Sequence, residues 1–468
     1  MELLIFPTPE NVIINDGEFV FTENTEIKFA ESNSLKSGAY KLCIDNDITV
    51  TYGDESGRLN GYNTLMQLKR NYDGKIPACV IEDEPKYSYR GFMLDCARHS
   101  FTLDEIKKII DELALLKFNY FHWHLTDDQG WRIESEKHPE LISTGSKRKA
   151  SWFDDGKEYS AYFTKAEMKE IASYCNERGI SVIPEFDVPG HTSALIASMP
   201  QLSCHKNQVE VKTNRGIFKD VLCVGSDVVY ETVIDLIDEI TDIFNPEYMH
   251  IGGDEVPKDN WQGCPVCQKA IKDNNLKDEK DLQTWFMKRV ADYVNSKGIK
   301  PIVWNESIKG EGLGKDDVIV QRWIGNPEKT VDFANNGGKY IESDFFNYYF
   351  DYPYGFTPLK KTCKYKPLIK GVKNKNSLFG VEAPLWTEFV KDFDRACYLI
   401  FPRLIAISET GWNGEIKDYK AFCKMAELYC KKQSDIKSAP AKDWDPSLAG
   451  RAGETVKFFM PFLTHLKD

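Results

Sequence analysis

The 468-residue chain lacks two features that would point to a membrane or to nucleic acid. No apolar run approaches the roughly 20 residues that span a bilayer, so we expect no membrane partner. There is no excess of positive charge either, since the formal net charge is −12 and Lys and Arg are scattered along the chain. Because phosphate binding needs a basic surface, we expect no nucleic-acid partner and favour a neutral substrate.

The chain also lacks a recognisable secretory leader. Its first residues carry no basic n-region, and their apolar run stops at Pro7. Most of the twelve cysteines stand singly in apolar segments, where a buried thiol behaves as a small hydrophobe. We therefore expect a cytoplasmic protein without a disulfide framework.

One pair of cysteines has the spacing of a zinc knuckle, in the segment Gly263-Cys-Pro-Val-Cys267. A structural zinc site takes four ligands, and no second pair lies near Cys264 and Cys267 in the sequence. We expect a loop turn at this motif, and neither a metal nor a cofactor in the protein.

The first 85 residues differ in pattern from the rest. Short β-rich runs at 11–14, 19–21, 27–29 and 48–52 precede one helical stretch at 57–70. The polar segment Glu82-Asp-Glu-Pro85 interrupts both periodicities. We expect a small α/β domain over 1–85 and a large domain over 86–468, with one more amphipathic helix in a tail from about residue 416.

Beyond residue 86, short apolar strands alternate with helical patterns, which is typical of a parallel sheet built from βα units. Thr102 and Thr164 begin capping boxes with Glu105 and Glu167, and Gly179 is placed where a helix should end. The expected strands are eight in number and predict a closed (β/α)8 TIM barrel: 90–95, 119–124, 180–184, 248–252, 301–304, 318–323, 340–343 and 378–382.

Charged and aromatic side chains follow these strands at their C-terminal ends, where barrel enzymes have their active sites. The first four strands lead to Arg98, Asp127, His191, Asp254 and Glu255. The last four lead to Trp304, Glu306, Trp323, Tyr349, Asp351, Trp386 and Glu388. Aromatic faces beside carboxylates and an arginine suit a sugar, because a pyranose offers C–H faces for stacking and hydroxyls for hydrogen bonds.

Several longer motifs carry a resemblance to a known family. They cover 90–99, 117–132, 185–191, 250–256, 380–388 and 401–403, and include His250-Ile-Gly-Gly-Asp-Glu-Val256 and Gly380-Val-Glu-Ala-Pro-Leu-Trp-Thr-Glu388. Together they closely resemble glycoside hydrolase family 20, the β-N-acetylhexosaminidases, from about Arg90 to Trp412. The resemblance implies that the barrel is the catalytic domain and that a small α/β domain precedes it.

The resemblance also implies a role for each site residue. Glu255 matches the general acid/base, Asp254 the residue that orients the 2-acetamido group, and Tyr349 the hydroxyl that binds the acetamido oxygen. The residues that resemble the family's contacts to the sugar are Arg98, Glu388, Asp351, Trp304, Trp323 and Trp386. Asp127 and His191 match a pair that supports Glu255.

The implied activity is exo-acting, retaining removal of terminal β-linked N-acetylglucosamine or N-acetylgalactosamine from glycans such as chitobiose. The resemblance implies substrate assistance through an oxazolinium intermediate. Independently, Asp254 and Glu255 are adjacent at one strand end, where consecutive side chains diverge, so they do not easily flank one bond as the carboxyl pair of other retaining enzymes does. The sequence leaves open the linkage, the sugar configuration and the oligomeric state.

Two other functions fit parts of the pattern. A metal-dependent barrel hydrolase could use His122, His124, Asp127, His191, His250 and Asp254 as ligands, although paired histidines in such enzymes usually follow the first strand. An inactive sugar-binding homologue would not need an intact acid with supporting residues. We expect His122 and His124 to face opposite sides of their strand and to pack or hydrogen bond.

Overall fold

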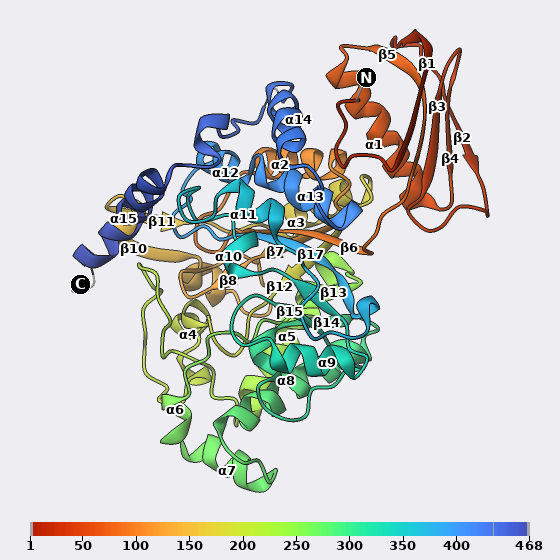
Figure 1. The fold of residues 1–468 in the computed structure, drawn as a ribbon. Helices are drawn as coiled ribbons and strands as arrows, with labels where there is room; N and C mark the ends of the chain where they lie inside the picture. The colour runs from red at the N-terminus through yellow and green to blue at the C-terminus, as the bar shows by residue number, and fades with distance from the viewer. Residues whose placement is uncertain (1–2, 434, 466–468) are drawn as a thin grey trace.

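The computed structural model describes residues 3–433 and 435–465 of the chain, which form a small sheet domain followed by a closed barrel (Figure 1). The small domain has the strand order β1-β5-β3-β4-β2, with the helix α1 packed against β3 and β4. Its elements are β1 (Asn11–Val20), β2 (Ile27–Glu31), β3 (Tyr40–Ile44), β4 (Ile48–Tyr52), α1 (Glu55–Asn71) and β5 (Lys75–Asp83).

The barrel is closed by eight parallel strands, which confirms the predicted TIM barrel and the small domain before it. Successive strands are neighbours, and β6 pairs with both β7 and β17 to close the ring. The strands are β6 (Tyr89–Asp95), β7 (Tyr120–His124), β12 (Ser181–Glu185), β13 (Tyr248–His250), β14 (Lys300–Trp304), β15 (Ile319–Arg322), β16 (Tyr340–Glu342) and β17 (Leu378–Leu385).

Helices and short hairpins surround the barrel. The predicted capping boxes of Thr102 and Thr164 both form, and Gly179 has a positive φ of 72° at a helix end. The helices here are α2 (Leu103–Leu115), α3 (Lys165–Asn176), α4 (Ser193–Ser198), α5 (Asp227–Phe244), α6 (Asp259–Gln262), α7 (Pro265–Asp273), α8 (Glu279–Ser296), α9 (Glu328–Asn335), α10 (Phe345–Tyr348), α11 (Leu359–Lys364), α12 (Phe393–Ile400) and α13 (Arg403–Asn413). The hairpin strands are β8 (Thr126–Asp127), β9 (Gly130–Trp131), β10 (Lys147–Ser151) and β11 (Lys157–Ser160).

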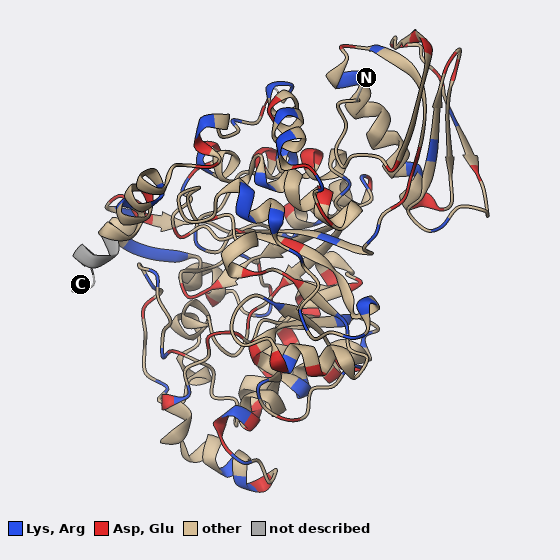
Figure 2. Ribbon diagram, viewed as in Figure 1, with Lys and Arg blue, Asp and Glu red and all other residues tan. Residues whose placement is uncertain are grey.

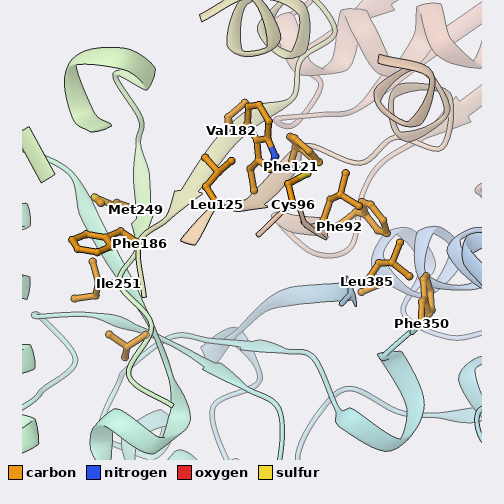
Figure 3. Packing of buried hydrophobic residues seen from close by; sticks show 14 of the residues in the cluster. Phe92, Cys96, Phe121, Leu125, Val182, Phe186, Met249, Ile251, Phe350 and Leu385 are labelled. Carbon is orange, nitrogen blue, oxygen red and sulfur yellow. The ribbon is translucent and has the colours of Figure 1, made fainter. Parts of the chain in front are cut away.

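The main hydrophobic core lies between the barrel strands and these helices. Figure 3 shows part of it, where Phe92, Phe121 and Val182 from three neighbouring strands lie close to one another. All seven residues of β6 are buried, as expected for a strand that is covered on both faces. This packing fixes the strand ends from which the site residues project.

The small domain contacts the barrel through one buried tryptophan and through buried polar groups around Asp83. Trp412, at the end of α13, lies in the small domain's core, and its indole N–H donates to Asp83 Oδ1 at 2.9 Å. The buried ammonium of Lys117 lies 3.7 Å from Asp83 Oδ2. Burial lowers the pKa of Lys117 to about 8, although Asp83 opposes the shift. An aromatic side chain and a buried ion pair thus join the two parts.

The structure corrects three sequence predictions. Two strands of the small domain, β3 and β5, and the hairpin strands β8 to β11 were not predicted. The tail contains two helices, α14 (Tyr419–Lys431) and α15 (Leu448–His465), where one was expected. The segment at Cys264 and Cys267 begins a helix and is not a loop turn, because Cys264 is the N-cap of α7 and Pro265 occupies the first helical position.

The distribution of charge agrees with the composition. In Figure 2 the Lys and Arg residues and the Asp and Glu residues are scattered over both the small domain and the barrel. Among the residues that the structure describes, the helices are too short or too polar to cross a bilayer.

Candidate active site

The loop after β13 places two adjacent acids, Asp254 and Glu255, at the C-terminal end of the barrel. Gly252 and Gly253 precede them with φ of 65° and 99°. A Cβ on Gly252 would lie 1.6 Å from Asp187 Oδ1, and one on Gly253 would lie 1.9 Å from a side-chain oxygen of the next loop. Only glycine permits this approach. Glu255 itself has a φ of 47°, a strained conformation of the kind that gathers at functional sites.

His191 connects these two acids to the loop after β7. Its Nε2 lies 3.6 Å from both Asp254 Oδ2 and Glu255 Oε2, and its Nδ1 lies 3.1 Å from Asp127 Oδ1. Burial alone would lower the pKa of His191, but Asp127 and Asp254 raise it well above its usual value. A buried imidazolium therefore lies between the three carboxyl groups.

Asp127 links His191 to the arginine that follows the first strand. Its Oδ2 lies 2.7 Å from Arg98 Nη2 and 2.8 Å from His124 Nε2. Burial would raise the pKa of Asp127, but Arg98 and His191 hold it far below its usual value. Arg98 also contacts Asp95 at 3.1 Å. Of the two predicted supporting residues, His191 thus lies beside Glu255, and Asp127 contacts His191.

Asp254 forms a second acid pair, with Asp187. Burial raises the pKa of Asp187 to about 8, and burial together with the charge of Asp187 raises that of Asp254. Two close carboxyl groups cannot both ionise easily, so the pair keeps one proton at neutral pH. Asp254 Oδ1 is buried and has no hydrogen-bond partner among the described residues. That oxygen is suited to accept a hydrogen bond from a bound substrate.

Glu255 is more exposed than its neighbour, with 29% of its side-chain surface accessible. Burial raises its pKa, Glu306 and Glu388 raise it further, and His191 and Arg98 oppose the shift. Glu306 also accepts the backbone N–H of Glu255 at 2.9 Å. The carboxyl of Glu255 therefore stays protonated to higher pH than an ordinary glutamate, as a general acid requires.

The predicted aromatic residues gather at the same end of the barrel. Trp304 and Trp386 have ring centroids 6.1 Å apart, and Trp323 stacks on Tyr349 at 5.9 Å with an interplanar angle of 17°. Burial raises the pKa of Tyr349 well above its usual value, a hydrogen bond with the Trp386 side chain opposes the shift, and the charges of Asp254 and Glu255 add to it. Tyr349 and the tryptophans therefore line the region in front of the two acids.

Arg98, Asp351 and Glu388 form a polar group beside Trp386. The Arg98 guanidinium stacks over the Trp386 ring at 5.0 Å, and Glu388 raises the pKa of Arg98. Asp351 is buried, and its Oδ1 has no hydrogen-bond partner in the described part of the chain. Burial and then Glu388 raise its pKa. These groups offer donors and acceptors for the hydroxyls of a sugar.

The loop that carries Tyr349 and Asp351 is anchored by hydrogen bonds from Arg403 of α13. The buried guanidinium donates to the carbonyl oxygens of Phe350 at 2.6 Å, Tyr352 at 3.0 Å and Thr357 at 3.3 Å. Three bonds from one rigid group fix the path of this loop.

Comparison with known proteins matches two family models to the chain. Residues 87–415 match the catalytic domain of glycosyl hydrolase family 20, and residues 27–84 match domain 2 of the same family. The chain belongs to glycosyl hydrolase family 20. The resemblance seen in the motifs is thereby confirmed, and the protein is a glycoside hydrolase.

Similar proteins support this assignment. A β-hexosaminidase of Porphyromonas gingivalis is 35% identical over 424 residues, which cover 85% of this chain and 53% of that protein, so the chain spans about half of its length. A β-hexosaminidase of Akkermansia muciniphila is 34% identical over 82% of this chain and 81% of its own. The solved family 20 exo-β-N-acetylglucosaminidase of Vibrio harveyi, in complex with N-acetylglucosamine, is 27% identical with a TM-score of 0.84, over 94% of this chain and 79% of its own.

The prediction for His122 and His124 in this family 20 hydrolase was wrong in one respect. Residues two apart on a strand point to the same face, and both imidazoles lie inside the barrel. His122 contacts Glu382 at 3.0 Å and Glu185 at 3.1 Å, and His124 hydrogen bonds both Glu185 and Asp127. The carboxylates raise the pKa values to about 9 for His122 and about 10 for His124, against burial.

These contacts disfavour the metal-dependent alternative for the family 20 site. A metal ligand must be a neutral imidazole with a free nitrogen, whereas both nitrogens of His122 and of His124 contact carboxylates. A chain of ion pairs thus runs from the barrel interior through Asp127 to His191. Through His191 this chain reaches both acids at the barrel mouth.

Three residues of this hydrolase's site were not assigned a role from the sequence. Asp187 raises the pKa of Asp254, Glu306 contacts the backbone of Glu255, and Arg215 hydrogen bonds Tyr352 and acts on the pKa of Asp351. Asp187 and Glu306 follow barrel strands, so their position was a usable signal. Arg215 lies in a long loop that shows no such pattern.

Proposed function

We propose that this family 20 hydrolase is an exo-acting, retaining β-N-acetylhexosaminidase that uses the substrate's own 2-acetamido group as the nucleophile. The observation that carries the proposal is the pair Asp254 and Glu255, held against one imidazolium with different proton affinities. The names of the relatives, β-hexosaminidase and exo-β-N-acetylglucosaminidase, support the substrate class. The cytoplasmic location stays a prediction from the sequence.

In the first step Glu255 gives its proton to the leaving oxygen, while the acetamido oxygen attacks the anomeric carbon from the other face. The bond to the leaving group breaks, and the sugar becomes an oxazolinium ion with positive charge on the former amide. Asp254 Oδ1 accepts the amide N–H and balances this charge, and the Tyr349 hydroxyl donates to the acetamido oxygen. The bound N–H favours the form in which Asp187 holds the shared proton and Asp254 the charge.

In the second step the Glu255 carboxylate takes a proton from water, and the water oxygen bonds to the anomeric carbon as the oxazolinium ring opens. Two inversions give net retention. Trp304, Trp323 and Trp386 supply apolar surface for the acetamido methyl and the sugar face, and they exclude water from the intermediate.

The raised pKa of Glu255 predicts how activity depends on pH. The carboxyl must be protonated, so kcat/KM should fall as pH rises through this pKa. Glu306→Gln removes one of the charges that raise it, and the alkaline limb of the kcat/KM profile should move to lower pH. Glu311→Gln is the control, since this exposed acid pairs with Lys277 outside the site and should leave the limb unchanged. An unchanged or upward-shifted limb in Glu306→Gln would contradict the role of Glu255.

Exo action follows from the polar groups that would surround the terminal hydroxyls. Arg98 and Asp351 are buried, and a sugar that continued past them would leave Asp351 Oδ1 unpaired. With a chitooligosaccharide of about five sugars, the earliest products should be N-acetylglucosamine and the chain shortened by one unit. Chromatography of a reducing-end-labelled substrate checks this. Early internal fragments without monosaccharide would mean an open cleft.

A further inference from the structure

Four cysteines that are distant in the sequence come together beside the active-site loops. Cys204 and Cys223 lie on the long connection between β12 and α5, where an isolated bridge pairs Ser203 with Leu222 and brings the two thiols side by side. Cys264 and Cys267 come from the start of α7, which projects at the lower end of the view in Figure 1. The sequence argument that the Cys264 pair has no second pair nearby is therefore wrong in three dimensions.

The four sulfur atoms have the spacing of ligands around one ion. All of them lie within 4.8 Å of one another. The Cys204–Cys267 distance is 3.8 Å, and Cys223 lies 3.7 Å from both Cys264 and Cys267. A tetrahedron with zinc–sulfur bonds of about 2.3 Å has edges of roughly 3.8 Å. A disulfide needs about 2.05 Å, and all twelve cysteines of the chain are free.

The surroundings of the cluster are also suited to thiolates. Cys223, Cys264 and Cys267 are buried, and Cys204 is half-buried. The N–H of Gly225 hydrogen bonds the Cys267 sulfur. A Cβ at Gly225 would lie 2.9 Å from Cys267 Cα and 2.7 Å from the carbonyl oxygen before it, so this approach requires glycine. Lys206 brings a positive charge toward Cys223 that offsets the charge of a four-thiolate centre.

We propose that Cys204, Cys223, Cys264 and Cys267 bind one zinc ion as a structural site. Four protein thiolates complete a tetrahedral shell and leave no position for water or substrate, so the ion takes no part in hydrolysis. As each zinc–sulfur bond forms, the thiol releases its proton to solvent, and neither the metal nor the sulfur changes oxidation state. The sequence expectation that the protein holds no metal is replaced by this proposal.

The ion would tie together the two loops that carry the acid and its supporting histidine. The segment between β12 and α5 that carries Cys223 is hydrogen bonded to the His191 loop, since Leu222 N–H donates to Pro189 O at 3.0 Å. Helix α6, which directly precedes α7, is hydrogen bonded to the same segment, since the indole of Trp261 donates to Leu222 O at 2.9 Å. The Glu255 loop leads directly into α6 and α7. Zinc would thus fix the distance between His191 and Glu255 from outside the barrel.

Metal content of the full-length protein is the direct test. Protein purified without chelators should contain about one zinc per chain by elemental analysis, and a mercurial thiol reagent should release it to a colorimetric indicator. Refolding or exchange with Co²⁺ should give the absorption of a tetrahedral thiolate centre. Less than about 0.1 zinc per chain, with no such cobalt spectrum, would overturn the proposal. So would iron in place of zinc, or disulfides among the four cysteines in a peptide map of the alkylated protein.

Substitution then assigns the ligands. The double variant Cys264→Ser/Cys267→Ser should lose the zinc and melt roughly 10 °C lower, while Cys423→Ser, a half-buried thiol outside the cluster, should keep both the metal and the melting temperature. If the double variant does not fold, release from the unaltered protein by the mercurial reagent still decides the question. Full zinc content in the double variant would assign the metal elsewhere. Neither readout depends on the proposed hydrolase activity.

Discussion

Glu255→Gln should lower kcat/KM for chitobiose by roughly 10³-fold and should lower it much less for an aryl N-acetylglucosaminide with an acidic phenol as leaving group. The glutamine keeps the size of the side chain but has no proton to give. A sugar hydroxyl is a poor leaving group and needs that proton, whereas a stabilised phenolate leaves without it. Measuring kcat/KM across phenols of different acidity checks the prediction, because this constant reports steps up to departure of the leaving group.

Two further measurements make this test specific. Azide needs no general base, so it should accelerate turnover of the aryl substrate by the Glu255→Gln variant and give the β-glycosyl azide. Glu306→Gln, a change of the same kind on the acid that contacts the Glu255 backbone, should not show the dependence on leaving group when it is measured at a pH below its alkaline limb, where Glu255 is protonated. Equal losses on chitobiose and on activated aryl substrates would remove Glu255 from the acid role.

The second large effect concerns the substrate. An aryl β-glucoside with a plain 2-hydroxyl should react at least about 10⁴-fold more slowly than the matching N-acetylglucosaminide, because an intramolecular nucleophile gains a high effective concentration. A thiazoline that copies the bicyclic intermediate should bind at least roughly 10²-fold more tightly than the substrate. Competition between the two aryl substrates measures the rate ratio, and competitive inhibition by the thiazoline measures its affinity. Efficient cleavage of the plain glucoside, or a sugar trapped on an enzyme carboxylate, would rule out substrate assistance.

Asp254→Asn tests the same step from the protein side. The charge of Asp254 is needed most when the acetamido group becomes positive, so the substitution should reduce kcat more than it raises KM. Asp187→Asn is the matched control, because a neutral partner leaves Asp254 ionised and keeps an oxygen for the N–H of Gly253, which Asp187 Oδ1 accepts at 3.0 Å. Its effect on kcat should be smaller. A larger loss of kcat in Asp187→Asn than in Asp254→Asn would mean that Asp187 carries the charge.

Much of the fold could be predicted because local patterns and the barrel agree. Buried parallel strands appear as short apolar runs, and all eight were placed within about three residues of their ends. Because Asp127, His191 and Glu255 follow the C-terminal ends of barrel strands, their proximity could be predicted from the fold alone. The capping boxes of Thr102 and Thr164 depend on neighbouring residues alone, so they too could be read from the sequence.

The errors concern features that depend on long-range contacts. β5 pairs with β1 and β3, which are both distant in the sequence, although β3 also pairs with its neighbour β4. The four cysteines are brought together by a bridge and a helix N-terminus on separate loops, so the spacing of one pair gave no sign of the other. The proton shared by Asp187 and Asp254 likewise depends on the close approach that Gly252 permits.

Arg403 anchors the loop that carries Tyr349 and Asp351, and the way it does so affects which substitutions this loop can accept. All three of its bonds to the loop end on main-chain oxygens. The bonds themselves therefore survive a change of side chain at Tyr352, whereas Phe350 and Tyr354 are also fixed by burial in the core. A substitution at Tyr352, next to Asp351, can thus alter the surroundings of the sugar site while the main chain of the loop keeps its course.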